Sequence, residues 1–331
     1  MACNHNHVTP LPVRRVAEFQ PQPPQAKWLI NQLWLQNGVG LLGGQAKVCK
    51  TYLAAELSLA VATGLPALGQ FKVYSQGPVL FFGAEDSPQS LRARFDGLSA
   101  ARGCDIETLP LYLIDVPVLR LDRDDERARL CAAIDLCKPR LLVLDPFVRL
   151  VGSIDENSAQ DVSSVLGNLR AIQRDHHLAI LLVHHARKSP ASTPYQAYRG
   201  SSDFAAWSDS NLFLMRKNNS LTLHAEHRSA RSPEPINLKL EHEPAPHLIC
   251  LAAQQSTSES VHLTSLCEAI RAQLQRTDRP MSTTELQNHL RCRRSHVVEA
   301  AALLQQHNII YRTKNGLQLC SNAQQATAQA P

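Results

Sequence analysis

Residues 39–51 of the chain have the sequence VGLLGGQAKVCKT, and the organisation of the other residues is best followed outward from this segment. It begins with Val39–Leu42, a mainly apolar run of the kind that forms strands buried on both faces. Glycines and polar residues come next, and an amphipathic stretch begins at Tyr52. The segment therefore predicts a strand, a tight loop and the start of a helix, in that order.

The loop matches the phosphate-binding pattern G-x-x-x-x-G-K-[ST] at every fixed position but one. In such loops, successive backbone N–H groups at a helix N-terminus hold phosphate oxygens. We expect Lys50 to reach the β- and γ-phosphates of ATP and the Thr51 hydroxyl to hold Mg²⁺. The residues predicted to surround the nucleotide are Gly44, Gln45, Ala46, Lys47, Val48, Cys49, Lys50, Thr51 and Tyr52.

Cys49 is the departure from the pattern, because it occupies the position of the second glycine. Glycine is usual there since the backbone packs closely around phosphate. A thiol side chain is small enough to fit, at a cost in affinity or turnover. The alternative interpretation is a chance glycine-rich turn before a helix.

Apolar runs and amphipathic stretches alternate along the chain. The runs predicted as strands are Val39–Leu42, Val79–Phe82, Leu141–Leu144 and Ala179–Val183, and the predicted helices are Tyr52–Thr63, Pro88–Arg102, Asp124–Cys137 and Ser158–His176. This order is typical of an α/β domain with a mainly parallel sheet. Two further runs, Leu212–Met215 and Leu221–His224, predict a closing antiparallel hairpin.

Acidic residues follow two of the predicted strands. Because the carboxyl ends of parallel strands meet at the ligand crevice, Asp145 is expected to support Mg²⁺ and Glu85 to activate water. The alternatives are a turn or cap residue at Asp145, and confusion of Glu85 with Asp86, which could instead cap the helix near Pro88. A third strand end has two adjacent histidines, of which we expect His184 to sense the γ-phosphate.

Together these motifs resemble the RecA-like AAA-type P-loop ATPases, a family that includes the hexameric plasmid replicative helicase RepA. The matching segments are Gly43–Thr51, Phe82–Asp86, Leu144–Phe147, Val183–Lys188 and Arg199–Ser202. The resemblance implies the roles just given to Lys50, Thr51, Glu85, Asp145 and His184. It also implies a ring of subunits with ATP between neighbours, and DNA as the partner.

In that family an arginine from the neighbouring subunit completes the site, because it stabilises charge that develops during phosphoryl transfer. Ten residues beyond Arg199, where the helicase has this arginine, the chain has Asp209. The candidates are Arg199, Arg216 and Arg228, with Arg199 preferred. DNA contacts are expected from Arg149, and from Arg187 and Lys188 beside the Pro/Ser/Thr-rich loop 189–196, although basic loop residues are often simply solvated.

The last part of the chain predicts a separate domain. Leu263, Leu266, Ile270 and Leu274 recur at helical spacing, and Ser282 with Glu285 forms the pattern of a capping box. A third helix is expected over 295–306, and a hairpin from 309–311 and 317–319. Three helices followed by a hairpin are typical of a winged helix-turn-helix.

The predicted recognition helix begins beside a basic cluster. Arg293 and Arg294 are expected to contact DNA phosphates, with Arg312 and Lys314 adding contacts from the wing. The alternative is a winged helix that contacts protein. Residues 263–321 contain eight Lys/Arg and four Asp/Glu, against a net charge of +5 for the whole chain, so an anionic partner is favoured for this domain.

The predicted organisation is a flexible leader (1–27), a RecA-like ATPase domain (28–250), a linker (251–262), the winged helix (263–321) and a disordered tail (322–331). No apolar run is long enough to span a membrane. Nine cysteines without any C-x-x-C pair favour reduced thiols in a cytoplasm. Three functions remain open: an ATP-driven ring acting on DNA, a slow nucleotide-gated DNA-binding regulator or loader, and a degenerate nucleotide-binding scaffold.

Overall fold

The structure is a computed structural model, and the chain divides into two compact units, Met1–Leu251 and Ala252–Pro331. The residues that it describes are 13–21, 23–152, 159–185, 202–217, 220–251, 257–277, 279–290, 292, 294–306, 309–313 and 316–320. The predicted tail, the loop 189–196, and parts of the predicted leader and linker lie outside these residues.

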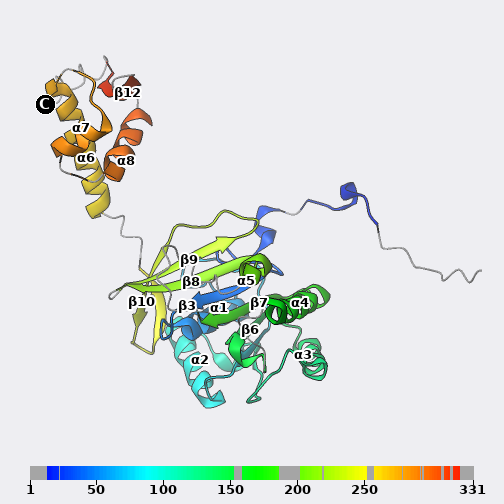
Figure 1. The fold of residues 1–331 in the computed structure, drawn as a ribbon. Helices are drawn as coiled ribbons and strands as arrows, with labels where there is room; N and C mark the ends of the chain where they lie inside the picture. The colour runs from blue at the N-terminus through cyan, green and yellow to red at the C-terminus, as the bar shows by residue number, and fades with distance from the viewer. Residues whose placement is uncertain are drawn as a thin grey trace, which may run out of the picture. The chain divides into compact units, whose positions relative to one another are not determined.

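The first unit is built on a nine-stranded sheet with the order β11-β10-β9-β8-β3-β7-β6-β4-β5 (Figure 1). The strands are β3 (Val39–Gly44), β4 (Val79–Gly83), β5 (Leu111–Leu113), β6 (Leu141–Asp145), β7 (Ala179–His185), β8 (Ser210–Lys217), β9 (Ser220–His227), β10 (Ile236–Glu241) and β11 (His247–Cys250). Pairing is parallel from β8 to β5 and antiparallel from β8 to β11. A separate hairpin is formed by β1 (Trp28–Ile30) and β2 (Trp34–Leu35).

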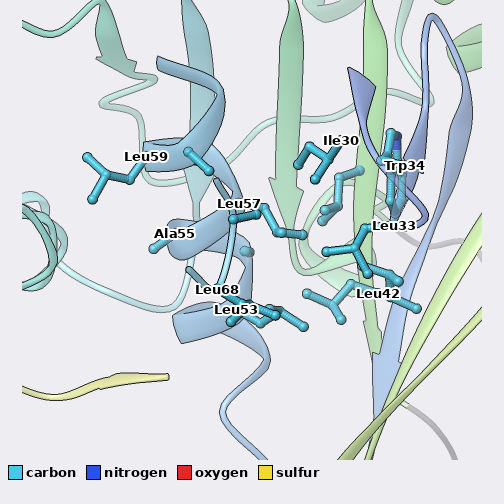
Figure 2. Packing of buried hydrophobic residues seen from close by; sticks show 14 of the residues in the cluster. Ile30, Leu33, Trp34, Leu42, Leu53, Ala55, Leu57, Leu59 and Leu68 are labelled. Atoms are coloured by element: carbon cyan, nitrogen blue, oxygen red, sulfur yellow. The ribbon is translucent and has the colours of Figure 1, made fainter. Parts of the chain in front are cut away.

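Helices cover the sheet on both faces. They are α1 (Lys50–Thr63), α2 (Pro88–Arg102), α3 (Asp124–Cys137), α4 (Ala159–His176) and α5 (Ser202–Trp207), with short 3-10 turns η1 (Val16–Glu18), η2 (Pro24–Lys27), η3 (Ile106–Thr108) and η4 (Phe147–Arg149). Strand residues alternate between two buried clusters, one with α1 and α2 and the other with α3, α4 and α5. In Figure 2, Leu53 and Leu57 of α1 lie against Leu33 and Leu42 in the first cluster.

The predicted strands and helices of this unit are confirmed, with bounds that differ by a few residues. The prediction missed β1, β2, β5, β10 and β11. Four of these, β1, β2, β5 and β11, have four residues or fewer, which is too short to show a clear periodicity. Such short strands depend on their neighbours for stability. The large, mainly parallel sheet with helices on both faces confirms the α/β class.

The second unit contains α6 (Thr257–Thr277), α7 (Thr283–Leu290), α8 (Arg294–Gln306), β12 (Ile310–Thr313) and β13 (Gly316–Leu319). Its own apolar core joins the three helices to the hairpin. The predicted capping box is confirmed: the Ser282 N–H donates to Glu285 Oε2 at 2.8 Å, and the Glu285 N–H donates to Ser282 Oγ at 3.1 Å. Gly316 has a φ of +132°, and a Cβ there would lie 2.4 Å from the Met281 backbone, so glycine is required.

No helix in the described part of the chain combines the length and the apolar character that crossing a bilayer requires.

Candidate nucleotide-binding site

The loop predicted to bind phosphate lies between β3 and α1, at the carboxyl ends of the parallel strands. Gly44 has a φ of +151°, and a Cβ there would lie 2.5 Å from the Leu214 carbonyl oxygen of β8. This position therefore needs glycine, because the loop leaves β3 in contact with the neighbouring strand. The backbone N–H groups at the start of α1 follow directly, as phosphate binding requires.

Cys49 adopts a left-handed conformation, with a φ of 67° and a ψ of 26°. This conformation gives a further reason for the glycine of the pattern, beside close packing, because a Cβ in the left-handed region costs about 1–2 kcal/mol. The Cys49 thiol also accepts a hydrogen bond from Nη2 of Arg216 at 3.6 Å. The loop thus holds a residue other than glycine in the left-handed region, at a cost in local strain.

Lys50 is buried inside the loop, with only 5% of its surface exposed. Its Nζ donates to the Gly44 carbonyl at 3.0 Å and to the Gln45 carbonyl at 2.8 Å. Burial lowers the pKa of Lys50, while the negative charges of Asp145 and Glu85 act in the opposite direction. The ammonium group is therefore placed between the loop and both predicted carboxylates.

Asp145 ends β6 on the same face of the sheet as α1, and it is 6% exposed. Burial raises the pKa of Asp145 to about 6, although a hydrogen bond from the Thr51 hydroxyl acts against the shift. Among the described residues, no group donates a hydrogen bond to Asp145 Oδ2. A buried carboxylate oxygen without a donor, next to a hydroxyl, is a donor set that suits Mg²⁺.

Glu85 follows β4, in a loop whose Ala84 N–H donates to the Asp145 carbonyl at 2.9 Å. Its carboxylate is half-exposed, and it lies 3.9 Å from Nε of Arg149 and 3.8 Å from Nε2 of His185. The structure therefore brings Glu85, Asp145, Lys50 and Thr51 together at one edge of the sheet. Arg149, which we expected to contact DNA, also lies beside this carboxylate.

The two adjacent histidines of β7 point to opposite faces of the sheet. The ring of His184 stacks on Phe204 with centroids 4.6 Å apart and lies edge-on to Phe147, on the face that α4 and α5 cover. His185 lies on the α1 face, and burial and Lys50 lower its pKa. The structure thus places His185, and not the predicted His184, on the same face of the sheet as the phosphate-binding loop.

The alternative role given to Asp86 is wrong. The cap of α2 is Ser87, whose Oγ accepts a hydrogen bond from the Ser90 N–H at 3.1 Å. Asp86 instead forms an ion pair with Arg94 at 2.7 Å. The Arg94 guanidinium lies over the ring of Tyr52, 4.6 Å from its centroid. Tyr52, predicted to contact the nucleotide, is therefore also in contact with α2.

Comparison with known proteins gives a match to a family model and matches to many solved structures. A family model described as "AAA domain" matches residues 7–191, which is more than half of the chain. The chain belongs to this family. One similar solved structure is that of a DnaB-like replicative helicase, reported together with its interactions with primase. It is 13% identical to this chain, with a TM-score of 0.51.

The match to the DnaB-like helicase covers 66% of this chain and 58% of that one. The ATPase domain of G40P is also 13% identical, with a TM-score of 0.49 over 66% of this chain and 86% of that domain. The likeness to the helicase concerns the fold alone, and it is consistent with the RecA-like fold expected from the sequence. The family match and this fold agree with the geometry of the site described above.

The arginines of the AAA chain are placed as follows. Arg199, like Arg187 and Lys188, lies outside the described residues. Arg216 lies on β8 and donates to the Cys49 thiol of the phosphate-binding loop in the same chain. Nη1 of Arg228 lies 3.5 Å from Asp209. Asp209 also pairs with Arg170 at 2.5 Å and accepts a hydrogen bond from the Val39 N–H at 3.1 Å, so it joins β3, α4 and the start of β8.

The predicted DNA contacts of the second unit are only partly described. Arg293 and Lys314 lie outside the described residues. Arg294 is the first residue of α8, and its side chain is not among those described. Arg312 lies on β12 and is exposed to solvent.

Proposed function

We propose that this AAA chain is a P-loop ATPase that hydrolyses ATP with Mg²⁺ and acts on or with DNA. The observation that carries the proposal is the convergence of Lys50, Thr51, Asp145 and Glu85 at the carboxyl ends of β3, β4 and β6. Each of these residue types is needed for phosphoryl transfer to water, and together they come from three different strand ends. Residues this far apart in the sequence meet here because the sheet is parallel.

In the proposed reaction, Lys50 and the N–H groups at the start of α1 bind phosphate oxygens of ATP. Mg²⁺, held by Thr51 and Asp145, would neutralise charge on the β- and γ-phosphates when bound. Glu85 orients the attacking water and accepts its proton. His185 lies next to Glu85 and takes the sensing role that the sequence had suggested for His184.

The second unit supports the DNA part of the proposal. Its three helices and hairpin follow the order of a winged helix-turn-helix, with α8 as the recognition helix and β12–β13 as the wing. We propose that Arg293, Arg294, Arg312 and Lys314 contact phosphates, and that Arg187 and Lys188 contribute from the first unit. The DnaB-like helicase that shares the fold is described as replicative, which supports a role linked to DNA.

The chain is further proposed to assemble as a ring in which a neighbouring subunit supplies the arginine, with Arg199 still the preferred candidate. A second function is favoured by two specific observations. Cys49 keeps the strained conformation of a glycine, and Asp209 occupies the position of the expected arginine in a structural network. Both features favour a slow, nucleotide-gated DNA-binding regulator over a strong motor.

The test is steady-state ATP hydrolysis with and without single-stranded and duplex DNA. Lys50→Ala should abolish nucleotide binding and turnover, whereas Glu85→Gln should bind ATP and lose at least a hundredfold in kcat, which corresponds to about 3 kcal/mol. Lys72→Ala and Glu107→Gln, which change the same residue types away from the site, should behave as wild type. If Glu85→Gln hydrolyses ATP normally, the role of Glu85 as general base is wrong.

The same measurement separates the two functions. Turnover that DNA stimulates supports the motor, and it makes a strand-separation assay worthwhile. Tight ATP binding with little turnover, unchanged by DNA, supports the regulator. No ATP binding at all would contradict both functions. It would leave only the third, a scaffold whose nucleotide-binding site has degenerated.

A further inference from the structure

Three side chains are in contact beside the loop that carries Glu85. Nη1 of Arg94 on α2 lies 2.7 Å from Oδ2 of Asp86, and its guanidinium covers the ring of Tyr52 on α1 at 4.6 Å. Asp86 directly follows Glu85, and Tyr52 directly follows Thr51. We call Tyr52, Asp86 and Arg94 the Arg94 clamp. It connects the residue after the proposed general base to the residue after the proposed magnesium ligand.

Both partners of the ion pair are largely shielded from solvent. The exposed fractions of the Arg94 and Asp86 side chains are 13% and 27%. Ser90 Oγ also donates to Oδ1 of Asp86 at 3.4 Å. A partly buried guanidinium that both pairs with a carboxylate and stacks on an aromatic ring has little freedom to move, because the planar group is fixed by both contacts.

The Glu85 carboxylate itself is held only loosely. The nearest side-chain nitrogens of Arg149 and His185 lie 3.9 and 3.8 Å from it, which is beyond ordinary hydrogen-bond distance. The loop is fixed on its first side by the hydrogen bond from the Ala84 N–H to the Asp145 carbonyl. On the C-terminal side of Glu85, the loop is held by the ion pair between Asp86 and Arg94. The orientation of Glu85 therefore depends on both flanking residues.

We propose that Arg94 is a positioning residue that sets Glu85 relative to Lys50 and Thr51 through Asp86 and Tyr52. The inference rests on the proposed function, since it assigns Arg94 to the same reaction. Misplacing a catalytic group by about 1 Å costs on the order of a hundredfold in rate. Arg94 does not touch the reacting atoms, so its loss lowers kcat and leaves ATP binding to Lys50 and the loop intact.

Arg92 provides a matched control on the same helix. It is 50% exposed, and it pairs with Asp96 at 2.8 Å and Glu107 at 2.5 Å, both away from the catalytic loop. Removing Arg92 takes away an arginine and two ion pairs of α2 without changing the clamp. Exposed ion pairs contribute little to stability, so Arg92→Ala should fold and work as wild type.

The experiment compares Arg94→Ala and Arg92→Ala in the full chain by kcat, by ATP affinity and by amide hydrogen exchange of residues 84–87. We expect Arg94→Ala to lower kcat at least tenfold, to change the ATP affinity less than twofold, and to speed exchange in the loop. Arg94→Lys keeps the charge without the planar stack, and it should lie between Arg94→Ala and wild type. Arg92→Ala should change none of the three.

A double-mutant cycle then tests whether Arg94 acts through Glu85. In the Glu85→Gln background, Arg94→Ala should lower the remaining rate less than twofold, because there is no general base left to position. A full tenfold loss in that background, or equal behaviour of Arg94→Ala and Arg92→Ala, would overturn the inference. If the wild type proves inactive, the ATPase proposal fails, and the exchange of residues 84–87 still decides whether Arg94 orders the loop.

Discussion

Asp145 combines deep burial with a carboxylate oxygen that no described group satisfies. Such an arrangement is costly in a protein that has only to fold, because a buried carboxylate loses its hydration. It becomes useful when a cation is bound, since the cation supplies the missing partner. At this residue, stability and function therefore make opposite demands.

We expect Asp145→Asn to stabilise the nucleotide-free protein. The pKa of Asp145 is raised by burial from 3.8 to about 6, so the folded state binds more protons than the unfolded state between these values. Stability from this group is thus lost as pH rises through that window, and at pH 7.5 the penalty is up to about 3 kcal/mol. Thermal unfolding without Mg²⁺ should show a higher Tm for the variant.

The control is Asp125→Asn, which changes an exposed aspartate of α3 and should leave the Tm near that of wild type. The same Asp145→Asn protein should lose Mg²⁺-dependent hydrolysis. A Tm below that of wild type would show that Asp145 stabilises the fold and would weaken its assignment to the metal.

That the two adjacent histidines of β7 lie on opposite faces could have been foreseen from the sequence alone. Side chains of a strand alternate between faces, so His185 shares a face with Leu181 and Val183, as Asp145 does with Val143. The Arg94 clamp could not have been predicted in this way. It depends on how α1 and α2 pack against each other, and no local pattern in either helix specifies that contact.

At the scale of elements, the hairpin β1–β2 is joined to the sheet by a chain of hydrogen bonds. The Leu35 N–H donates to Ser210 Oγ at 3.0 Å, and Ser210 Oγ lies 3.1 Å from Nδ1 of His227. Nε2 of His227 lies 2.9 Å from the Gln32 carbonyl. Neutral His227 satisfies every group if Nε2 carries the proton, since Nδ1 then accepts from the serine.

This chain of bonds should make stability depend on pH. Burial lowers the pKa of His227 below its usual 6.5, so between the two values the unfolded state binds more protons than the folded state. Stability is therefore full above pH 6.5 and falls as pH drops toward the lower value. In urea unfolding from pH 7.5 to pH 5, His227→Gln should be less stable than wild type and less sensitive to pH.

His185 and His224 also have lowered pKa values, so some pH dependence should remain in the variant. His242→Gln, at an exposed position after β10, is the control and should keep the full wild-type dependence. An unchanged pH profile in His227→Gln would mean that this histidine does not titrate in the range.

The elements themselves were predictable where their patterns were long. Four buried strands and four helices followed from runs of apolar residues and from helical periodicity. The antiparallel extension β10–β11 was missed, although INLKLE at 236–241 alternates clearly, because we expected the sheet to end at the hairpin. Three-residue β5 has no pattern of its own, and it forms because β4 offers a parallel partner.

At the scale of the whole molecule, the chain has two units, and the family match covers residues 7–191 within the first. The properties of an AAA domain therefore say nothing about residues 257–320. Their role has to be argued from their own elements and charge. The excess of basic residues in this segment can be tested directly, by measuring how DNA binding depends on salt.

We expect duplex DNA to bind the full chain with an affinity that falls steeply as salt rises, because phosphate contacts release counterions. Arg312→Ala should weaken binding to all sequences alike and reduce the slope of log K against log salt by about 1. Arg276→Ala removes the same charge from the last turn of α6 and serves as the control. Fluorescence anisotropy from low to high salt measures both. Binding that does not depend on salt would favour the protein-contact interpretation of this unit.

Asp209 carries a consequence for the substitutions that this fold can accept. Its carboxylate faces two guanidinium groups, those of Arg170 and Arg228, and it also receives the first N–H of β3. An arginine at position 209 would place a third positive charge beside Arg170 and Arg228. It would also leave the Val39 N–H without its acceptor. Replacing Asp209 with arginine therefore calls for a compensating change at Arg170 or Arg228 and for a new acceptor of the Val39 N–H.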